Sequence, residues 1–232
     1  MNLKHTLIAS AVFAVLASSQ ANAADTDLKP YIEGQIGYIN LSKVDTNTYN
    51  GTSGAVTATN FAGKLNYHSN ETYGAELGFK NVMMPNLRVG MSFATMKLNL
   101  KNASTTGTIR DNSIGGATIS AGTASAADIA AIGVTFDTRV HLYMANAYYD
   151  FKNESKLTPF VGVGMGVADI QNAKSNEFTY TVNAGAKYNI DQHVYIGAKA
   201  AYSNINGPAD QLGLKYKNID AYTANLSLGF EF

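Results

Sequence analysis

The strongest constraint on this chain is the strict alternation of apolar with small or polar side chains along its C-terminal segment, 222–232. One set is apolar: Tyr222, Ala224, Leu226, Leu228, Phe230 and Phe232. The other set is polar or small: Thr223, Asn225, Ser227, Gly229 and Glu231. Because successive side chains of a β-strand point to opposite sides, this segment predicts a ribbon with one apolar face and one polar face. A water-soluble sheet and a sheet in lipid both use such a ribbon.

The N-terminal residues have the three parts of a secretory signal peptide. Lys4 gives a basic start, residues 7–16 are apolar, and Ala-Asn-Ala at 21–23 is a cleavage site of the small-x-small type. The apolar run is shorter than the ~20 residues that a membrane-spanning helix needs. We therefore expect residues 1–23 to be a signal peptide and residues 24–232 to be the mature domain. The alternative is a buried N-terminal helix.

Composition restricts the classes of protein that remain. Hydrophobic residues make up 46% of the chain, but they are dispersed, and the mean hydropathy is −0.09. An exported chain of this kind is either soluble or inserted as a closed barrel, in which every backbone polar group is paired within the lipid. The chain has no cysteine, which excludes disulfides and cysteine metal sites. A formal net charge of zero does not favour binding to nucleic acid.

Period-two alternation recurs along the whole chain and predicts eight strands. The predicted strands cover residues 30–41, 71–80, 87–100, 139–151, 158–168, 177–188, 193–202 and 222–232. About ten residues per strand, tilted by ~40°, span the ~25 Å lipid-facing band of an outer-membrane barrel. The sequence thus predicts an all-β fold, an eight-stranded antiparallel up-and-down transmembrane β-barrel with long extracellular loops.

The connections between these strands differ in length in a regular way. Those at 81–86, 152–157 and 189–192 are short, whereas those at 42–70 and 101–138 are long and those at 169–176 and 203–219 are intermediate. Short turns at one end and longer loops at the other are typical of outer-membrane barrels, whose long loops face outward. An even number of strands also predicts that both termini are periplasmic.

Aromatic residues on the expected outer face gather at the two ends of the strands. At the loop end they are Tyr38, Tyr73, Phe178, Tyr180, Tyr202 and Tyr222. At the turn end they are Phe79, Tyr149, Phe151, Tyr188, Phe230 and Phe232. Two aromatic belts separated by small and aliphatic residues indicate two lipid–water boundaries.

Two regions depart from the alternation. In 93–100 the apolar side chains change face between Phe93 and Met96, which predicts either a β-bulge or an extension beyond the membrane. The segment 128–136 is more apolar than an exposed loop, so we expect it to cap the barrel, to pair as a hairpin or to contact a partner. The segment 101–127, rich in Ser, Thr, Ala and Gly, is expected to be mobile.

The expected inner face carries equal numbers of opposite charges. The acidic residues are Glu33, Glu76, Asp150 and Glu231, and the basic residues are Lys80, Arg88, Lys187 and Lys199. Paired carboxylates serve acid–base catalysis in some enzymes, but buried charges that persist as pairs also fill a narrow barrel. We interpret the set as a cross-linked polar plug with a central ion pair between Glu76 and Lys199.

No motif indicates a catalytic, cofactor-binding or metal-binding residue. Gly162, Gly164 and Gly166 have strand spacing and lack the helix and lysine of a phosphate-binding loop, so we expect them to make room for Tyr148 and Tyr195. Mature-chain histidines occur at positions 68, 141 and 193, without ligand spacing. A serine nucleophile with a distant histidine remains open, because triads assemble in space.

Four segments carry a resemblance to a known group of proteins: 31–38 (YIEGQIGY), 144–151 (MANAYYDF), 158–168 (TPFVGVGMGVA) and 226–232 (LSLGFEF). With the strand pattern, the chain resembles the OmpA/OmpX-type superfamily of small outer-membrane barrels, including opacity-type bacterial surface antigens. The resemblance implies that Phe232 is a signal for the outer-membrane assembly machinery. The longer OmpA type continues into a peptidoglycan-binding domain, which is not expected after Phe232.

These observations lead to a functional hypothesis. We expect a non-enzymatic outer-membrane surface protein, a surface antigen or adhesin-like or structural envelope protein, that lies in lipid and lipopolysaccharide and meets host-surface molecules through 42–70 and 101–138. A narrow porin-like channel for small solutes is the alternative, and a lipid-modifying outer-membrane enzyme is a third class. Neither a cofactor nor nucleic acid is expected.

Overall fold

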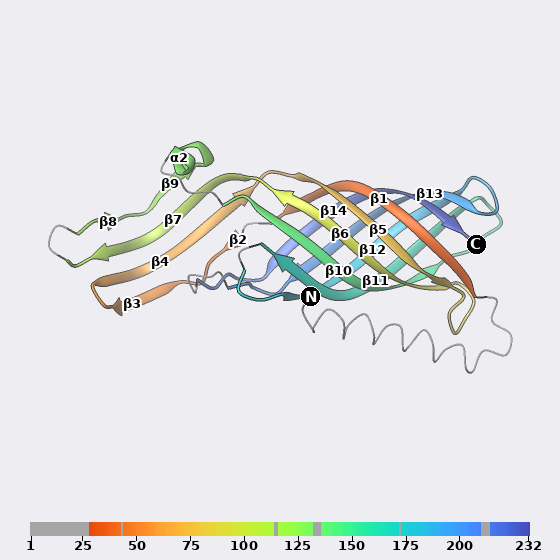
Figure 1. Ribbon diagram of the computed structural model, residues 1–232, viewed down its shortest axis with the longest axis horizontal. Helices are drawn as coiled ribbons and strands as arrows, with labels where there is room; N and C mark the ends of the chain where they lie inside the picture. The colour runs from red at the N-terminus through yellow and green to blue at the C-terminus, as the bar shows by residue number, and fades with distance from the viewer. Residues whose placement is uncertain (1–27, 43, 114–115, 132–135, 172, 210–213) are drawn as a thin grey trace.

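The computed structural model describes residues 28–42, 44–113, 116–131, 136–171, 173–209 and 214–232, so the expected signal peptide (1–23) lies outside the described residues. Long antiparallel strands dominate this part of the chain (Figure 1). Eight of them form a closed barrel: β1 (Lys29–Leu41), β5 (Asn70–Lys80), β6 (Leu87–Leu98), β10 (Thr138–Asp150), β11 (Leu157–Ile170), β12 (Glu177–Asn189), β13 (Val194–Ile205) and β14 (Ile219–Glu231). Each corresponds to one of the eight predicted strands, which confirms the fold class.

The barrel closes by pairing its first strand with its last. Around the barrel the order is β1-β14-β13-β12-β11-β10-β6-β5, and β5 returns to β1. Tyr31, for example, pairs with Glu231 on β14 and with Gly78 on β5. Closure leaves no open sheet edge, which is the condition for placing a sheet in hydrocarbon.

The two faces of the barrel have the polarity that the alternation predicts. On the outside, Leu226 is 64% exposed and Val163 is 60% exposed, and the other large outward side chains of the mid-strand region are also apolar. On the inside, Glu76 and Asp150 are buried. A continuous exposed apolar band of this kind is stable only when lipid surrounds it.

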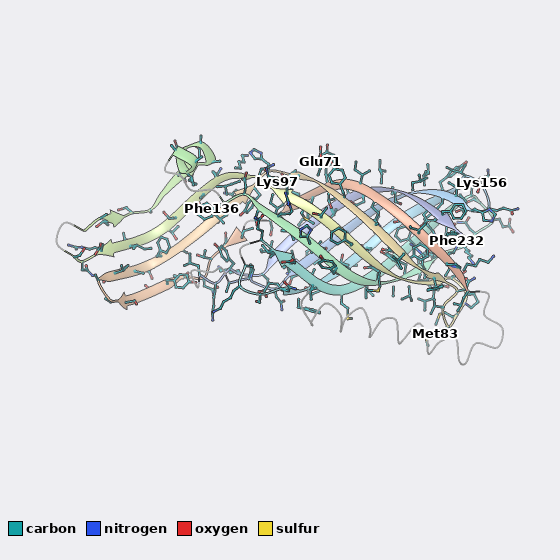
Figure 2. All side chains as sticks on the ribbon, in the orientation of Figure 1. Glu71, Met83, Lys97, Phe136, Lys156 and Phe232 are labelled. Atoms are coloured by element: carbon teal, nitrogen blue, oxygen red, sulfur yellow. The ribbon has the colours of Figure 1, made fainter. Side chains whose placement is uncertain are left out.

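The end with short turns is compact and shows the expected aromatic side chains. Met83, Lys156 and Phe232 lie at this end in Figure 2. The 189–194 turn is held by Asp191, whose carboxylate accepts hydrogen bonds from the N–H groups of His193 (2.7 Å) and Val194 (2.8 Å). These bonds hold the pKa of the Asp191 carboxyl below its usual value.

The long extracellular loops that the sequence predicts are not confirmed, because much of the two longest connections is β-strand. Most of 42–70 and 101–138 forms a second sheet, called the outer sheet below, which projects from the barrel end opposite the C-terminus (Figure 1). Its elements are β2 (Val44–Asp45), β3 (Tyr49–Ser53), β4 (Val56–Tyr67), β7 (Leu100–Asp111), β8 (Thr118–Ile119) and β9 (Gly122–Ser125).

The prediction that 101–127 is mobile is therefore wrong for most of that segment. It lies in β7, β8, β9 and the start of the short helix α2 (Ala126–Ala131), which packs on β7 and β9 and buries Ile129. The segment is poor in large apolar residues, but it is rich in threonine, which favours strands, and β4 offers a partner of similar composition. Backbone pairing of β7 with β4 gives this segment a regular strand structure that its amino-acid composition alone does not predict.

The change of apolar face in 93–100 also has a different cause from a bulge. β6 stays in unbroken register with β10 from Leu87 to Leu98, so Phe93 points outward while Met96 and Leu98 point inward. The alternation of inward and outward side chains along β6 is therefore unbroken, and it is the polarity of the lumen that changes. At this end the interior of the barrel is apolar, and the inward positions are apolar for that reason.

We predict that a charge on the outer face destabilises the protein according to depth. Leu226→Arg places a guanidinium in the middle of the apolar band and should lower the free energy of folding into lipid bilayers by ~2–4 kcal/mol. Met83→Arg, in the exposed 81–86 turn, is the matched control and should cost no more than ~1 kcal/mol. Urea titration in vesicles measures both. Equal effects of the two substitutions would contradict the assigned outer face.

Candidate functional site

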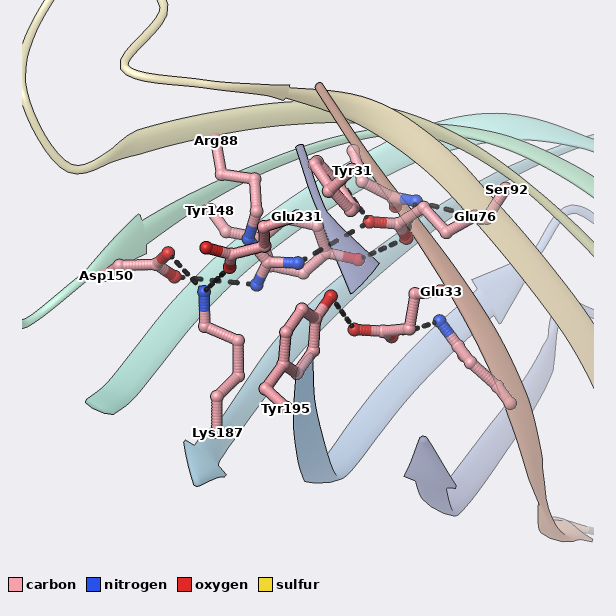
Figure 3. A network of polar contacts seen from close by, with 12 residues as sticks. Tyr31, Glu33, Glu76, Arg88, Ser92, Tyr148, Asp150, Lys187, Tyr195 and Glu231 are labelled. Atoms are coloured by element: carbon pink, nitrogen blue, oxygen red, sulfur yellow. Dashed lines mark hydrogen bonds and ion pairs between the residues drawn. The ribbon is translucent and has the colours of Figure 1, made fainter. Parts of the chain in front are cut away.

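The centre of the barrel is organised around Glu76, whose side chain is almost completely buried. Its carboxylate accepts hydrogen bonds from the Tyr31 hydroxyl (2.6 Å), the Tyr148 hydroxyl (2.8 Å) and the Asn146 Nδ2 group (3.0 Å). The Arg88 Nη1 atom lies 3.8 Å from the same carboxylate. Figure 3 shows Tyr31, Tyr148 and Arg88, which come from β1, β10 and β6, converging on Glu76. Three donors and one positive charge offset the cost of burying this anion.

The predicted central ion pair between Glu76 and Lys199 is wrong. Arg88 is the basic partner of Glu76, whereas the Lys199 ammonium lies 5.7 Å from the centre of the Tyr148 ring. When the paired residues are followed from Lys199 through β14 and β1, the ladder reaches Thr72 on β5, four residues before Glu76. Mid-strand position alone does not determine level in a barrel with tilted, staggered strands.

A second group of charges continues the network toward the turn end. The Lys187 ammonium lies 2.6 Å from one Asp150 oxygen, and Arg88 Nη2 lies 3.5 Å from the other. Lys187 is also 3.7 Å from Glu231, and Glu231 in turn pairs with Lys80. The chain of pairs joins β5, β6, β10, β12 and β14 across the lumen. We call it, together with Glu76 and Glu33, the polar plug.

Aromatic rings fill the space around the polar plug. The Arg88 guanidinium carbon lies 4.2 Å from the centre of the Tyr148 ring and 5.2 Å from that of Phe160, distances at which a cation is attracted to a ring face. The Tyr195 hydroxyl donates to Glu33 at 2.7 Å. The plug is thus both charged and densely packed.

Glycines lie opposite these rings because the rings approach the backbone of the neighbouring strands too closely to leave room for a side chain. A Cβ atom at Gly162 would overlap the Tyr148 ring, which confirms part of the role predicted for the 162–166 glycines. The Tyr195 ring is accommodated instead by Gly229, where a Cβ atom would overlap it. The remaining ring that closes the plug, Tyr31, was missed in the sequence, although it shares its strand face with Glu33.

The polar plug has the properties of a structural filling. All four predicted acids and three of the four predicted bases take part in it, and each has at least one partner within the plug or on a neighbouring tyrosine or amide side chain, although the Nε atom of Arg88 has no hydrogen-bond partner. Within the described ranges, no group of three or more His, Asp or Glu side chains has the geometry of a metal site. The described helices include none long and apolar enough to cross a membrane.

A second candidate site is the outer sheet, which is fixed to the barrel by backbone bonds. The Lys217 N–H donates to the Asp45 carbonyl and the Asn47 N–H donates to the Lys215 carbonyl, each at 2.8 Å. The Ser42 N–H likewise donates to the Asp220 carbonyl at 2.8 Å. These bonds join the root of the outer sheet to the connection before β14 and to the start of β14 itself.

A bulge bends the two longest strands of the outer sheet midway. The β4–β7 register shifts between Thr59 and Ala62, where Asn60 has a φ of 48° and Gly107 has a φ of 70°. A Cβ atom at Gly107 would overlap the carbonyl oxygens of Thr59 and Asn60. A residue without a side chain is therefore needed at position 107. Beyond the bulge, β3 and β8 complete the tip of the sheet.

We predict that Glu76 is coupled to Arg88 and not to Lys199. Glu76→Ala should lower the free energy of unfolding by about 3–5 kcal/mol, because it leaves a buried guanidinium and two hydroxyls short of an acceptor. Lys199→Ala should cost less than about 1 kcal/mol. Double-mutant cycles in detergent should give a coupling of about 1 kcal/mol or more for Glu76 with Arg88, and effects with Lys199 that add within about 0.5 kcal/mol. Stronger coupling to Lys199 would overturn the assignment.

Comparisons with known proteins found several chains that are similar to this one. The Outer membrane protein PagN of Salmonella typhimurium is 30% identical over 89 residues, which cover 32% of this chain and 37% of PagN. The chain therefore matches only about a third of the length of this curated relative. The crystal structure of Neisserial surface protein A superimposes with a TM-score of 0.53 at 14% identity, over 88% of this chain and 97% of that one. OprG from Pseudomonas aeruginosa gives a TM-score of 0.45 at 14% identity, over 88% and 95%.

The family model for the outer membrane protein β-barrel domain matches residues 9–232, nearly the whole chain. The exposed apolar band and the closed barrel of this chain agree with an outer-membrane β-barrel domain. Residues of the barrel thus lie in the lipid of the bacterial outer membrane, with the outer sheet at the cell surface. The chain belongs to the outer membrane protein β-barrel domain family.

Proposed function

We propose that this protein is a non-enzymatic surface protein, adhesin-like or antigenic, that binds partners outside the cell through its outer sheet. The observation that carries the proposal is the outer sheet itself, an ordered structure raised above the barrel and not needed to close it. Function concentrates on segments that a rigid scaffold holds in place. Here the scaffold is the barrel with its polar plug.

The surface chemistry of the outer sheet supports binding to polar macromolecules. β3 is almost entirely exposed and consists of Tyr, Asn, Gly, Thr and Ser. β7 contains half-buried Asn, Ser and Thr residues, and its exposed residues are Lys101, Thr106 and Arg110. The polar side chains supply adaptable hydrogen bonds. Among the described strands, β3 pairs only with β4, so its other edge presents backbone groups that an extended segment of a partner can pair with.

A purely structural role in the envelope is the simpler form of this proposal. It would use the barrel and polar plug alone and would leave the outer sheet without a ligand. The two forms differ in what happens when the tip of the outer sheet is removed, because the barrel pairs and the bonds at the root of the sheet stay in place.

We predict that removing the tip abolishes surface binding and leaves the barrel folded. Residues 50–59 and 108–121 would each be replaced by Asn-Gly. The first replacement joins the remainder of β3 to β4, and the second joins β7 to β9, each by a short turn near the bulge. Bacteria expressing this variant should lose the adhesion to host cells and matrix proteins that the unchanged protein confers. The readout is the number of adherent cells, and the shift in gel mobility on heating checks barrel folding.

The matched control shortens a connection at the opposite end, with Asn-Gly in place of residues 152–156, and should retain adhesion. Unchanged adhesion after removal of the tip would defeat the adhesin form. If cells with the unchanged protein adhere no better than cells that lack it, only the structural role in the envelope remains as a proposal. The polar plug argues against the channel alternative, since its linked charge pairs run from β5 through β6, β10 and β12 to β14 and fill the lumen at that level. Steady single-channel current in planar bilayers would favour the channel instead.

The C-terminal residue is the proposed contact with the outer-membrane assembly machinery. Phe232 is 65% exposed at the turn end, its N–H donates to the Pro30 carbonyl at 3.0 Å, and its ring lies 5.0 Å from that of Phe230. We predict that Phe232→Ala lowers the amount of folded protein in the outer membrane several-fold, measured by heat-modifiable gel mobility. Phe151→Ala, at another exposed ring of the same belt, is the control. Equal losses for both would indicate a general role of the belt.

A further inference from the structure

The lumen of the barrel changes character along its axis. The half near the turns holds the polar plug, but the outer end is lined by buried apolar side chains that contact one another as a cluster. Within this cluster lies a cavity of about 290 Å³, called the apolar cup below. The polar plug gives no reason for an apolar interior at this end. A mouth filled with water would be expected to have a polar lining.

The walls of the apolar cup come from the barrel, the outer sheet and their connections. The side chains from the barrel strands include Ile39, Met96, Val140, Leu142, Ile205 and Ile219. Val44, Leu65 and Tyr67 of the outer sheet and Phe136 of the connection before β10 complete the wall. Figure 2 shows Phe136 near the junction of the barrel and the outer sheet. Its exposed fraction is 39%.

The apolar cup is closed toward the membrane interior. Met96, Leu142 and Ser203 line both the cup and a second, polar cavity below it of about 70 Å³, so these residues form the floor. Asn146 and Tyr148 border the lower cavity and also bond to Glu76 of the polar plug. A molecule in the cup therefore has a way in from outside and no continuation through the barrel.

Polar groups at the rim define which molecules fit. Asp137 is the one charged residue among the described residues that line the cup, and its carboxylate accepts a hydrogen bond from the Leu100 N–H at 2.9 Å. The Tyr67 hydroxyl donates to the Phe136 carbonyl at 3.2 Å. Burial, with Tyr216 and Asp137 nearby, raises the pKa of Tyr67 well above its usual value, so its phenol is neutral. No cation among these residues would hold an anionic head group.

We propose that the apolar cup is a binding site for a small, uncharged apolar molecule, a medium-chain aliphatic or single-ring compound, taken up from the cell exterior. An apolar cavity of this size is poorly hydrated, and cavities of ~150 Å³ lined by aliphatic and aromatic residues already bind such compounds. Burial of the ligand's apolar surface supplies the binding free energy. The site is distinct from the outer face of the sheet on which the proposed adhesion depends.

The chain offers a clean optical test because it contains no tryptophan. Phe136→Trp places a single fluorophore at the wall of the cup, and Phe93→Trp places one on the lipid-facing surface of β6. Both proteins would be reconstituted in lipid nanodiscs and titrated with 1-bromooctane, whose bromine quenches tryptophan on contact. We expect saturable quenching of Trp at position 136. Quenching at position 93 should rise only in proportion to partitioning into lipid.

A filling substitution in the Phe136→Trp background tests the cavity directly. Val140→Phe occupies the cup and should weaken the saturable phase by about tenfold or more. Val161→Phe adds the same side chain to the lipid-facing surface of β11 and should leave it unchanged. Ile205→Thr, which shortens the side chain and adds a hydroxyl to the apolar wall, should weaken binding as well, and it serves if Val140→Phe fails to show the heat-modifiable folded form. The anionic analogue 8-bromooctanoate should bind at least about tenfold more weakly than 1-bromooctane beside Asp137.

Each other outcome overturns the inference. Parallel, non-saturating curves for the two reporters would show partitioning without a site. Saturable quenching that folded Val140→Phe and Ile205→Thr proteins both retain would place the site elsewhere. Tighter binding of 8-bromooctanoate would reject an uncharged ligand. Adhesion assays on the Val140→Phe protein report separately on the outer sheet, so the failure of one proposal does not decide the other.

Discussion

The structure depends on the requirement that every backbone polar group within hydrocarbon be paired inside the protein. A sheet meets this requirement only by closing on itself, and here β1 meets both β14 and β5. Closure of eight strands leaves a lumen just wide enough for side chains. The inward face of each strand must therefore fill that space, and the outward face must be apolar. The two side-chain patterns of the chain are consequences of one backbone constraint.

The lumen is filled in two chemically different ways. Near the turns, the lumen is filled by paired charges, among them Glu76, Arg88 and Asp150 on three neighbouring strands. In such an arrangement losing one partner costs more than the pair contributes. Near the cell exterior, the filling is aliphatic and incomplete, and it leaves the apolar cup. The polar plug crosslinks strands that are distant in sequence and rigidifies the scaffold. The apolar cup lies above it, where a ligand can enter without crossing the plug.

Outside the membrane the backbone constraint is relaxed, and the chain uses that freedom to build a sheet with edges. Water satisfies the edge groups of β3, so the outer sheet can remain open. Its bonds to the connection before β14 hold its root in place, and the bulge at Gly107 sets the direction of its tip. Rigid placement of a polar, exposed surface is what the proposed role in binding needs.

The alternation of side chains by itself determined the barrel. A period of two predicts all eight strands, the short turns, the aromatic ends and the set of buried charges. It can do so because that period is a local property of each strand. Which charges meet was decided by tertiary structure. Glu76 pairs with Arg88 on the adjacent strand β6 and not with Lys199 on β13. Tilt and stagger set the level of each residue, and the level of Lys199 relative to Glu76 depends on the two strands between them, β14 and β1. The outer sheet likewise emerged only from pairing between β4 and β7, whose weak local patterns acquire order from each other. The apolar cup was visible in the sequence as the change of face at Met96, but its meaning required the closed lumen, since only closure brings side chains from distant strands around one space.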